Sequence, residues 1–304
     1  MLQVNVSSET APLKAVVLGT AESFGGAPKV EEAYDPKSIE NILNDTFPEE
    51  ERLVREISEF ESVLKKHNVE VFRPNLIEHY NQIFSRDIGF VIDNVFVKSN
   101  VLQQRGREIE GIQHIIDQIP DEQVIVPSSE VSVEGGDVVL WEDYIFIGYS
   151  EEEDFNQYTV SRTNSAGLDF LQAAFPHKRV KAFELSKSDE DPRLNTLHLD
   201  CCFQPIGRDQ AIVFEDGFKN AEDYQFLQSL FGQSNLVEVE REEMYQMNAN
   251  VFSINQRVIV SERNFKRLNN ELRRRGFEVE EIMYQEVAKM EGLLRCSTLP
   301  LIRA

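Results

Sequence analysis

The sequence has few cysteines, few cationic residues and no long apolar segment. Its three cysteines, two of them adjacent at Cys201 and Cys202, do not build a disulfide framework, which indicates a reducing compartment. No apolar run approaches the roughly 18 residues that a membrane-spanning helix needs. The amino terminus also lacks the basic start and apolar stretch of an export signal. We therefore expect a soluble, cytoplasmic protein.

Positive charge is scarce, because 31 Lys and Arg stand against 53 Asp and Glu, a net charge of −22 over 304 residues. A surface this acidic repels the phosphates of nucleic acids and anionic lipids, so both are poor partners. It is compatible with a cationic small molecule, and it leaves homo-oligomerisation open. The hydrophobic share of 41% and the charged share of 28% exclude wholesale disorder. The length allows two average domains or one large α/β or repeat-built domain.

What the chain does contain is a repeated unit. Four segments carry β-branched and aromatic residues in period-two runs around a tight polar turn, which predicts hairpins. Each hairpin is followed by a helix-like stretch, and most of these by a further short strand. The hairpins are 88–100, 137–150, 202–217 and 251–262; the helices are 105–118, 164–175, 221–231 and 263–276; the strands are 123–127, 236–240 and 277–282.

The amino-terminal part fits the same scheme, with a strand at 13–19, a helix at 48–67 and a strand at 69–74. A unit of hairpin, helix and strand repeated about five times predicts units closed around an axis. An ordinary mixed α/β sandwich with the same spacing is the alternative. Residues 20–47 are predicted to form an irregular stretch that covers an active site.

Polar residues stand just before the hairpins, at the same place in successive units. In a closed repeat fold such positions converge at one end of the axis, where a site is built from distant pieces of chain. Asn250 precedes the fourth hairpin, and Arg295-Cys296-Ser297 supplies the last piece. The chemically versatile members of the set are Asp87, Glu134, Asp137, His198, Asp200 and Cys296.

The chemistry open to this set is restricted. A cysteine with a histidine and a carboxylate is suited to nucleophilic catalysis, in which the thiolate attacks and the imidazole moves protons. Further carboxylates would repel the oxyanion that develops on a carbonyl substrate. They suit an electrophile that is itself a cation, such as a guanidinium, whose N–H pairs match carboxylates.

Five short motifs resemble those of the guanidino-group-modifying superfamily, which comprises arginine deiminases, glycine amidinotransferases and dimethylarginine dimethylaminohydrolases. The motifs keep the family's order from residue 85 to the end of the chain. The resemblance implies the pentein fold, a five-bladed α/β propeller with pseudo-fivefold ββαβ-type repeats, and a single catalytic domain over residues 1–304. The motifs are Ser85-Arg86-Asp87, Glu134-Gly135-Gly136-Asp137, Ser161-Arg162-Thr163-Asn164, Leu197-His198-Leu199-Asp200 and Gly292-Leu293-Leu294-Arg295-Cys296-Ser297.

The resemblance also implies the catalytic roles. Cys296 would attack the guanidinium carbon and form a covalent amidino-thioether. His198 would protonate the departing amine and then activate the water or amine that resolves the intermediate. Glu134 would orient His198 and stabilise its charge. No metal and no organic cofactor is required by this scheme.

Substrate contacts follow from the same resemblance. Asp87 and Asp200 would clamp the guanidinium, and Asp137 would lie on the substrate side or serve as a structural hydrogen-bonding residue. Arg162 would hold the substrate's carboxylate, with Arg105 or Arg107 as weaker candidates.

The branch within the superfamily is ambiguous. Asp200 resembles the deiminases and amidinotransferases, whereas the Gly292-Leu293-Leu294 run resembles the methylarginine branch. Glu291 stands where arginine deiminases tend to carry an arginine, which calls the α-carboxylate contact of a standard deiminase into question.

Four functions remain for comparison. The first is hydrolysis of arginine or a close derivative to a ureido product, as in arginine deiminases and dimethylargininases. The second is transfer of the amidino group to an acceptor amine such as glycine. The third is a catalytically silent propeller that only binds. A zinc hydrolase using His198, Cys201 and Cys202 is disfavoured, because adjacent cysteines do not match the usual zinc-ligand spacing.

Overall fold

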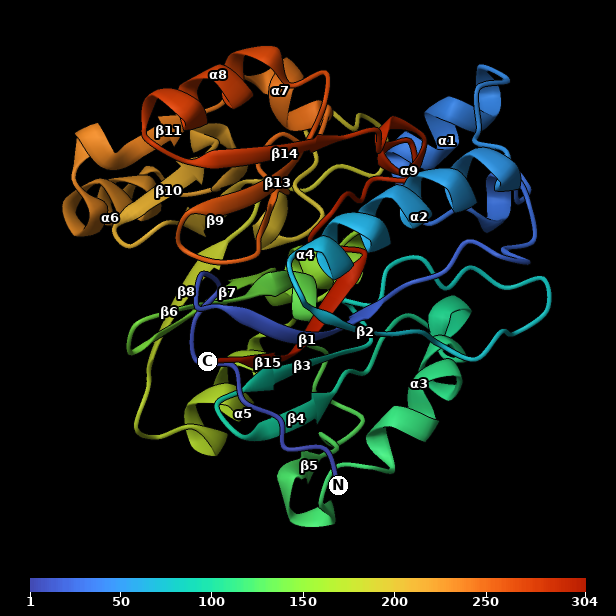
Figure 1. The fold of residues 1–304 in the computed structure, drawn as a ribbon, viewed down its shortest axis with the longest axis horizontal. Coiled ribbons are helices and arrows are strands. Elements are labelled where there is room, and N and C mark those ends of the chain that lie inside the picture. Colours follow the sequence, from blue (N-terminus) through green and yellow to red (C-terminus); the bar gives the residue numbers. More distant parts are fainter.

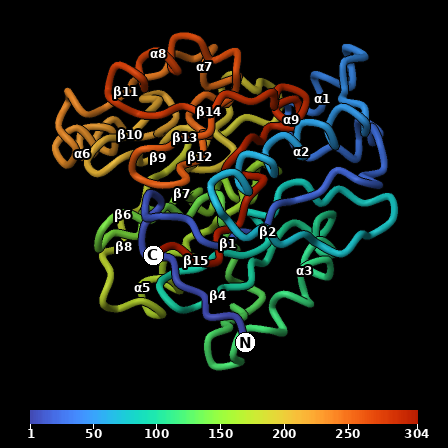
Figure 2. Tube along the Cα trace, in the orientation of Figure 1, coloured from blue at the N-terminus to red at the C-terminus, as the bar shows by residue number.

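The computed structural model describes residues 1–304 and contains five sheets of three strands each (Figures 1 and 2). In every sheet the middle strand pairs antiparallel with one neighbour and parallel with the other. The predicted five-bladed α/β architecture is therefore confirmed. The strands, sheet by sheet, are β15 (Thr298–Arg303), β1 (Leu13–Leu18) and β2 (Glu70–Phe72); β3 (Gly89–Ile92), β4 (Val95–Lys98) and β5 (Val124–Ile125); β6 (Val138–Trp141), β7 (Tyr144–Tyr149) and β8 (Arg179–Glu184); β9 (Phe203–Ile206), β10 (Gln210–Val213) and β11 (Leu236–Glu238); and β12 (Phe252–Ser253), β13 (Val258–Glu262) and β14 (Glu278–Ile282).

Helices connect the middle strand of each sheet to the parallel third strand, because a parallel pair cannot be joined by a tight turn. The third strand β8 was not predicted, since Arg179 and Lys181 interrupt its apolar pattern. None of the helices is long and apolar enough to cross a bilayer. The crossover helices are α1 (Pro36–Leu43) and α2 (Glu50–Lys66), α3 (Glu108–Ile116), α4 (Glu152–Gln157) and α5 (Ser165–Ala174), α6 (Ala221–Phe231) and α8 (Lys266–Arg274), while α7 (Arg241–Tyr245) and α9 (Gln285–Ala288) follow β11 and β14.

Local sequence explains the regular elements. The turn residues Asp93 and Glu142 take φ values of 49° and 52°, the left-handed conformation that tight two-residue hairpin turns require. Helix α2 buries Leu53, Ile57, Phe60 and Leu64 along one face and keeps acidic residues in its first turn and lysines in its last. That charge order complements the helix dipole.

The two ends of the chain close the ring. The amino-terminal unit was predicted without a hairpin partner, and the carboxy-terminal strand β15 supplies it by pairing antiparallel with β1 (Val16 opposite Pro300, Leu18 opposite Thr298). Figure 1 shows the red β15 beside the blue β1. Cys296 lies two residues before β15, so closing the ring also places this cysteine.

The segment 20–47 lines the main cavity at many positions, as the sequence predicts for a covering stretch. It is not irregular throughout, because α1 forms within it. Pro36 stands at the first turn of α1, and the Asp35 carboxylate accepts a hydrogen bond from the Ser38 backbone N–H at 2.7 Å. Both features are favoured at helix starts.

Candidate active site

The loops that lead into β3, β9 and β15 bring Asp87, His198 and Cys296 to one cavity of about 440 Å³. All three residues are at least nine-tenths buried. The charged and polar lining is completed from the segment 20–47, from the region of α3, from the loop between α4 and α5, and from the turn before β15. Its other members include Glu32, Tyr34, Asp35, Arg105, Glu108, Arg162 and Glu291.

His198 lies between two carboxylates. Its Nε2 is 2.9 Å from Glu134 Oε2, and its Nδ1 has no hydrogen-bond partner and lies 3.7 Å from Asp87 Oδ1. Burial alone would lower the pKa of His198, but Asp87, Asp137 and Glu134 outweigh burial and raise that pKa to about 9. Burial likewise opposes ionisation of Glu134, yet Arg162 and His198 bring its pKa down to about 2. The pair is therefore an imidazolium and a carboxylate at neutral pH.

The two glycines of the Glu-Gly-Gly-Asp motif permit this arrangement. A Cβ on Gly136 would come within 2.6 Å of His198 Nδ1 and 2.9 Å of Asp87 Oδ1. A Cβ on Gly135 would lie 2.1 Å from the carbonyl oxygen of Arg86. Only glycine allows the backbone to approach these groups so closely.

Arg105 is fully engaged with acidic neighbours. Its Nη1 donates to Asp87 Oδ2 at 2.7 Å, and its Nε and Nη2 donate to the two oxygens of Glu108 at 2.7 and 2.8 Å. Burial raises the pKa of Glu108 to about 7, although Arg105 opposes the rise. The other weak candidate, Arg107, does not line the cavity, because its exposed side chain reaches outward towards Glu110.

Arg162 lines the cavity and is also held by the protein. Its Nε donates to the Thr159 carbonyl at 3.2 Å, its Nη2 to the Tyr34 carbonyl at 3.0 Å, and its Nη1 lies 3.7 Å from Glu134 Oε2. Its guanidinium sits over the Tyr34 ring. Arg162 is thus fixed by two backbone carbonyls, and it shares the Glu134 carboxylate with His198 and Arg105.

Cys296 is 2% exposed and has a polar environment. Asn250 Nδ2 donates to its Sγ at 3.2 Å, and Asn250 Oδ1 accepts from the backbone N–H of both Arg295 and Cys296. Burial, followed by repulsion from Asp200 and Asp87, raises the pKa of the thiol above its usual range. At neutral pH these raised pKa values favour a neutral Cys296 thiol and a protonated His198.

The role of Asp200 as a guanidinium clamp stays a prediction. Asp200 is absent from the cavity lining, and its Oδ2 accepts from Arg295 Nη1 at 2.6 Å. Arg295 in turn donates to both oxygens of Glu9, at 3.0 and 3.3 Å. Asp200 still lies close to the chemistry, with Oδ2 3.8 Å from Cys296 Sγ.

Asp137 also lies outside the cavity. Its Oδ2 accepts from the Thr163 hydroxyl at 2.6 Å, and its Oδ1 accepts from the Leu199 backbone N–H at 2.9 Å. Both carboxylate oxygens are therefore used to join neighbouring loops. This favours the structural interpretation of Asp137 over the substrate-side one.

Two further residues, Asn250 and Glu291, belong to the site, and the sequence analysis had given neither of them a role there. Asn250 stands before the fourth hairpin, and that position was the available signal for its contact with Cys296. Glu291 was noted only as a departure from the deiminase pattern, yet it lines the cavity and is 4% exposed.

Two groups of side chains have the spacing of a metal site. Asp87, Glu134 and His198 offer ligand atoms within 4.8 Å of one another. Arg105 Nη1 already lies 2.7 Å from Asp87 and 3.6 Å from Glu134, so the chain's own cation faces these carboxylates. Neither group includes a cysteine: Cys202 Sγ donates to the Leu199 carbonyl. The zinc alternative therefore has no support in this geometry.

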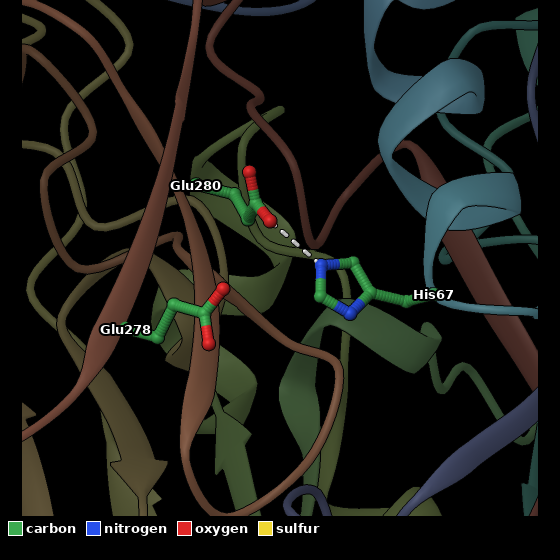
Figure 3. A group of neighbouring side chains, drawn as sticks. All are labelled: His67, Glu278 and Glu280. Carbon is green, nitrogen blue, oxygen red and sulfur yellow. Dashed lines mark hydrogen bonds and ion pairs between the residues drawn. The ribbon is translucent and has the colours of Figure 1, made fainter.

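The second group, His67, Glu278 and Glu280, lies between the end of α2 and β14 (Figure 3). His67 Nε2 is 2.7 Å from Glu280 Oε1, the interaction that the figure marks with a dashed line. The Lys66 ammonium donates to the same oxygen at 2.6 Å. This group lies away from the cavity and is already paired with a cation.

The sequence was compared with known protein families and with individual proteins. The family described as N,N dimethylarginine dimethylhydrolase, eukaryotic, matches residues 37–303. The uncharacterised protein YkgA of Bacillus subtilis is 30% identical over 281 residues, 88% of each chain.

Solved structures share the fold at low identity. The amino-terminal domain of ArgZ, an arginine dihydrolase of cyanobacteria, is 17% identical with a TM-score of 0.79, over 95% of this chain and 98% of that one. The inosamine-phosphate amidinotransferase StrB1 of Streptomyces griseus is 15% identical with a TM-score of 0.75, over 100% and 98%. The chain belongs to the dimethylarginine dimethylhydrolase family, within the guanidino-group-modifying enzymes of pentein fold.

Proposed function

We propose that the protein hydrolyses a guanidino C–N bond of arginine or a close arginine derivative to a ureido product, through a covalent intermediate on Cys296. One observation carries the proposal: Cys296, His198 and Asp87 line a single cavity in which His198 Nδ1 and Asp87 Oδ1 have no partner within the protein. A guanidinium would supply the missing N–H donors to Asp87 Oδ1. Such unpartnered buried atoms are expected where a ligand completes the hydrogen bonding.

Substrate binding would prepare the nucleophile. The same carboxylates that raise the pKa of the Cys296 thiol attract a guanidinium, and a cation beside the sulfur favours the thiolate, whose proton is released to solvent because His198 is already protonated. The thiolate then attacks the guanidinium carbon and forms a C–S bond. His198 gives its Nδ1 proton to the departing amine as the C–N bond breaks.

Water completes the reaction. Neutral His198 takes a proton from a water molecule, whose oxygen attacks the carbon of the thiouronium. The C–S bond then breaks and returns the thiolate. The remaining hydroxyl proton passes to solvent, which leaves the neutral ureido product. Glu134 would hold the imidazole through Nε2 during both steps. A structure of the ArgZ domain holds a covalently bound reaction intermediate, which supports the same course.

The role proposed for Asp200 differs from the guanidinium clamp that the sequence predicts. Because Arg295 holds its carboxylate 3.8 Å from Cys296 Sγ, Asp200 would stabilise positive charge on the carbon attached to sulfur. Asp87 would then be the carboxylate that contacts the guanidinium from within the cavity.

Amidino transfer is the second candidate, supported by the fold shared with StrB1 over the whole chain. In that reaction an amine replaces water at the thiouronium carbon. The residues named above would serve either outcome, because the acceptor alone differs.

Product analysis tests both candidates. Purified protein would be incubated with arginine and with Nω-methylarginine, with and without glycine, beside a Cys296→Ala control. We expect citrulline that the variant does not form. Ornithine together with guanidinoacetate, formed only when glycine is present, would replace hydrolysis by transfer. Citrulline formed equally by the Cys296→Ala variant would overturn the assigned nucleophile.

A further inference from the structure

The motif Ser85-Arg86-Asp87 contains an arginine that the proposed reaction does not use. Arg86 is 4% exposed, and it does not line the cavity of Cys296. Its Nε donates to the Arg295 carbonyl at 3.4 Å, which is longer than most hydrogen bonds, and its Nη2 has no hydrogen-bond partner. Its backbone N–H donates to the Cys296 carbonyl at 3.0 Å, so the arginine is joined to the segment that carries the proposed nucleophile.

Arg86 belongs to a buried group of five charged residues. The charges that act most strongly on it are those of the other four members, and no member is more than 4% exposed. Three members are arginines and two are carboxylates, which leaves one positive charge in excess. The group consists of Glu9, Arg86, Asp200, Arg295 and Arg303.

The two carboxylates of this group pair with one arginine only. Glu9 Oε1 lies 3.0 Å from Arg295 Nη2, and Asp200 Oδ2 lies 2.6 Å from Arg295 Nη1. Neither carboxylate forms an ion pair with Arg86. The guanidinium of Arg86 is therefore buried without a counter-ion in direct contact.

Arg303 also lacks an ion-pair partner, but it is better satisfied than Arg86. Its Nη1 and Nη2 donate to the carbonyls of Ala11 and Ser253 at 2.7 and 2.8 Å, and only its Nε has no partner. Its guanidinium also lies over the Phe252 ring. The least satisfied positive charge of the group is therefore that of Arg86.

A buried, unpaired guanidinium is strongly unfavourable unless a counter-ion accompanies it. Burial, followed by repulsion from Arg295, lowers the pKa of Arg86 to about 9, so the side chain is still charged at neutral pH. A water molecule would accept the free N–H of Arg86 but would leave the charge unbalanced. A small anion would do both.

We infer that a small inorganic monoanion such as chloride binds at Arg86 Nη2 within this group of five residues. A single negative charge neutralises the group, and a spherical ion accepts hydrogen bonds from any direction. Because no member of the group lines the cavity of Cys296, the anion is a structural ion and takes no part in the proposed reaction. The inference therefore does not rest on the proposed function.

Crystallography of the wild-type protein with sodium bromide tests the position of the ion. Bromide replaces chloride at such sites and is identified by its anomalous scattering. We expect an anomalous peak within hydrogen-bonding distance of Arg86 Nη2. A water molecule at this position, with no anomalous peak, would overturn the inference.

Stability at constant ionic strength shows whether the ion binds in solution. Sodium chloride is exchanged for sodium gluconate, whose anion is too large for a buried site of this kind. Each tenfold rise in chloride above its dissociation constant should raise the melting temperature by about 2 °C, because the ion binds the folded state alone. A peak in the crystal without this dependence would indicate an adventitious ion only and would refute the inference.

Substitution of Arg86 assigns the effect to one side chain. Arg86→Met removes the charge, so its melting temperature should not depend on chloride, and in gluconate it should be at least as stable as the wild type. Arg273→Met is the control, because Arg273 pairs with Glu281 at the surface and its loss should leave the chloride dependence unchanged. A chloride dependence that persists in Arg86→Met would contradict the assignment. The bromide and chloride measurements on the wild type decide the question even if this variant does not fold.

Discussion

Two buried clusters of charge flank Cys296, and they differ in how completely they are paired. The Arg295 cluster consists of Glu9, Asp200 and Arg295, and all three guanidinium nitrogens of its arginine have partners. The His198 cluster consists of Asp87, Glu134 and His198, and it leaves Asp87 Oδ1 and His198 Nδ1 without a hydrogen bond. Buried charges that are fully paired support a structure, whereas unpartnered atoms beside a cavity mark where a ligand binds.

The comparison predicts that the two clusters respond differently to substitution. Damage to the His198 cluster should abolish turnover and leave the fold intact. Damage to the Arg295 cluster should destabilise the fold first, because the buried carboxylates lose the ion pairs that hold them.

The largest effect is expected at the nucleophile and its acid–base partner. Cys296→Ala and His198→Ala should each lower kcat by about 10³-fold or more, and the double variant should be little worse, since the two residues act as a unit. Turnover of the preferred guanidine measures this. Cys202→Ala is the control, because Cys202 is equally buried but donates to the Leu199 carbonyl. A double variant far below both singles would contradict the coupling.

The next effect is on stability. Arg295→Met should lower the free energy of unfolding by about 3–5 kcal/mol, because the buried Glu9 and Asp200 carboxylates lose the guanidinium that donates hydrogen bonds to both. Urea denaturation measures the loss. Arg273→Met is the control: its ion pair with Glu281 is at the surface and should be worth about 0–1 kcal/mol. Equal losses in both variants would contradict the structural role assigned to the Arg295 cluster.

The two clusters should also differ in the pH range over which they contribute to stability. Burial opposes ionisation of Glu9, but Arg295 lowers its pKa to about 2, so its stabilisation is present above about pH 4.5 and lost as the pH falls through 2. The pKa of His198 is raised to about 9, so its contribution is present below about pH 6.5 and lost as the pH rises through 9. Melting temperatures across pH should show Glu9→Gln changing only the acid limb and His198→Asn only the alkaline limb. The reverse pattern would refute the assignment.

The smallest effect concerns Asp137, which belongs to neither cluster. Asp137→Asn should cost about 1–3 kcal/mol of stability, because one of its two hydrogen bonds is lost, and should leave KM unchanged. Denaturation and steady-state kinetics together test this. A large rise in KM at unchanged stability would instead restore Asp137 to the substrate side.

Local patterns made the repeats predictable from the sequence. Strand alternation, polar turns such as Asp93-Asn94 and the amphipathic face of α2 are encoded within a few residues. The recurrence of polar residues before each hairpin then predicted that Asp87, His198 and Cys296 would be close together in the structure, and the cavity brings these three side chains together.

Which residues far apart in the sequence pair with one another could not be predicted from local patterns. Arg295 pairs with Glu9, which lies 286 positions earlier, and the same guanidinium binds the Asp200 carboxylate. Closure of the first sheet by β15 likewise depends on contacts between the two ends of the chain. The left-handed backbone of Glu291 is set by its surroundings, and no turn signal marks it apart from the glycine that follows.

The most direct test of the central claim is mass spectrometry of the protein quenched with acid during turnover. The account predicts an adduct on the peptide that contains Cys296, with the mass of the substrate less its departing amine, absent from the Cys296→Ala protein. Turnover without any adduct on that peptide, or an adduct on Cys201 or Cys202 instead, would contradict it.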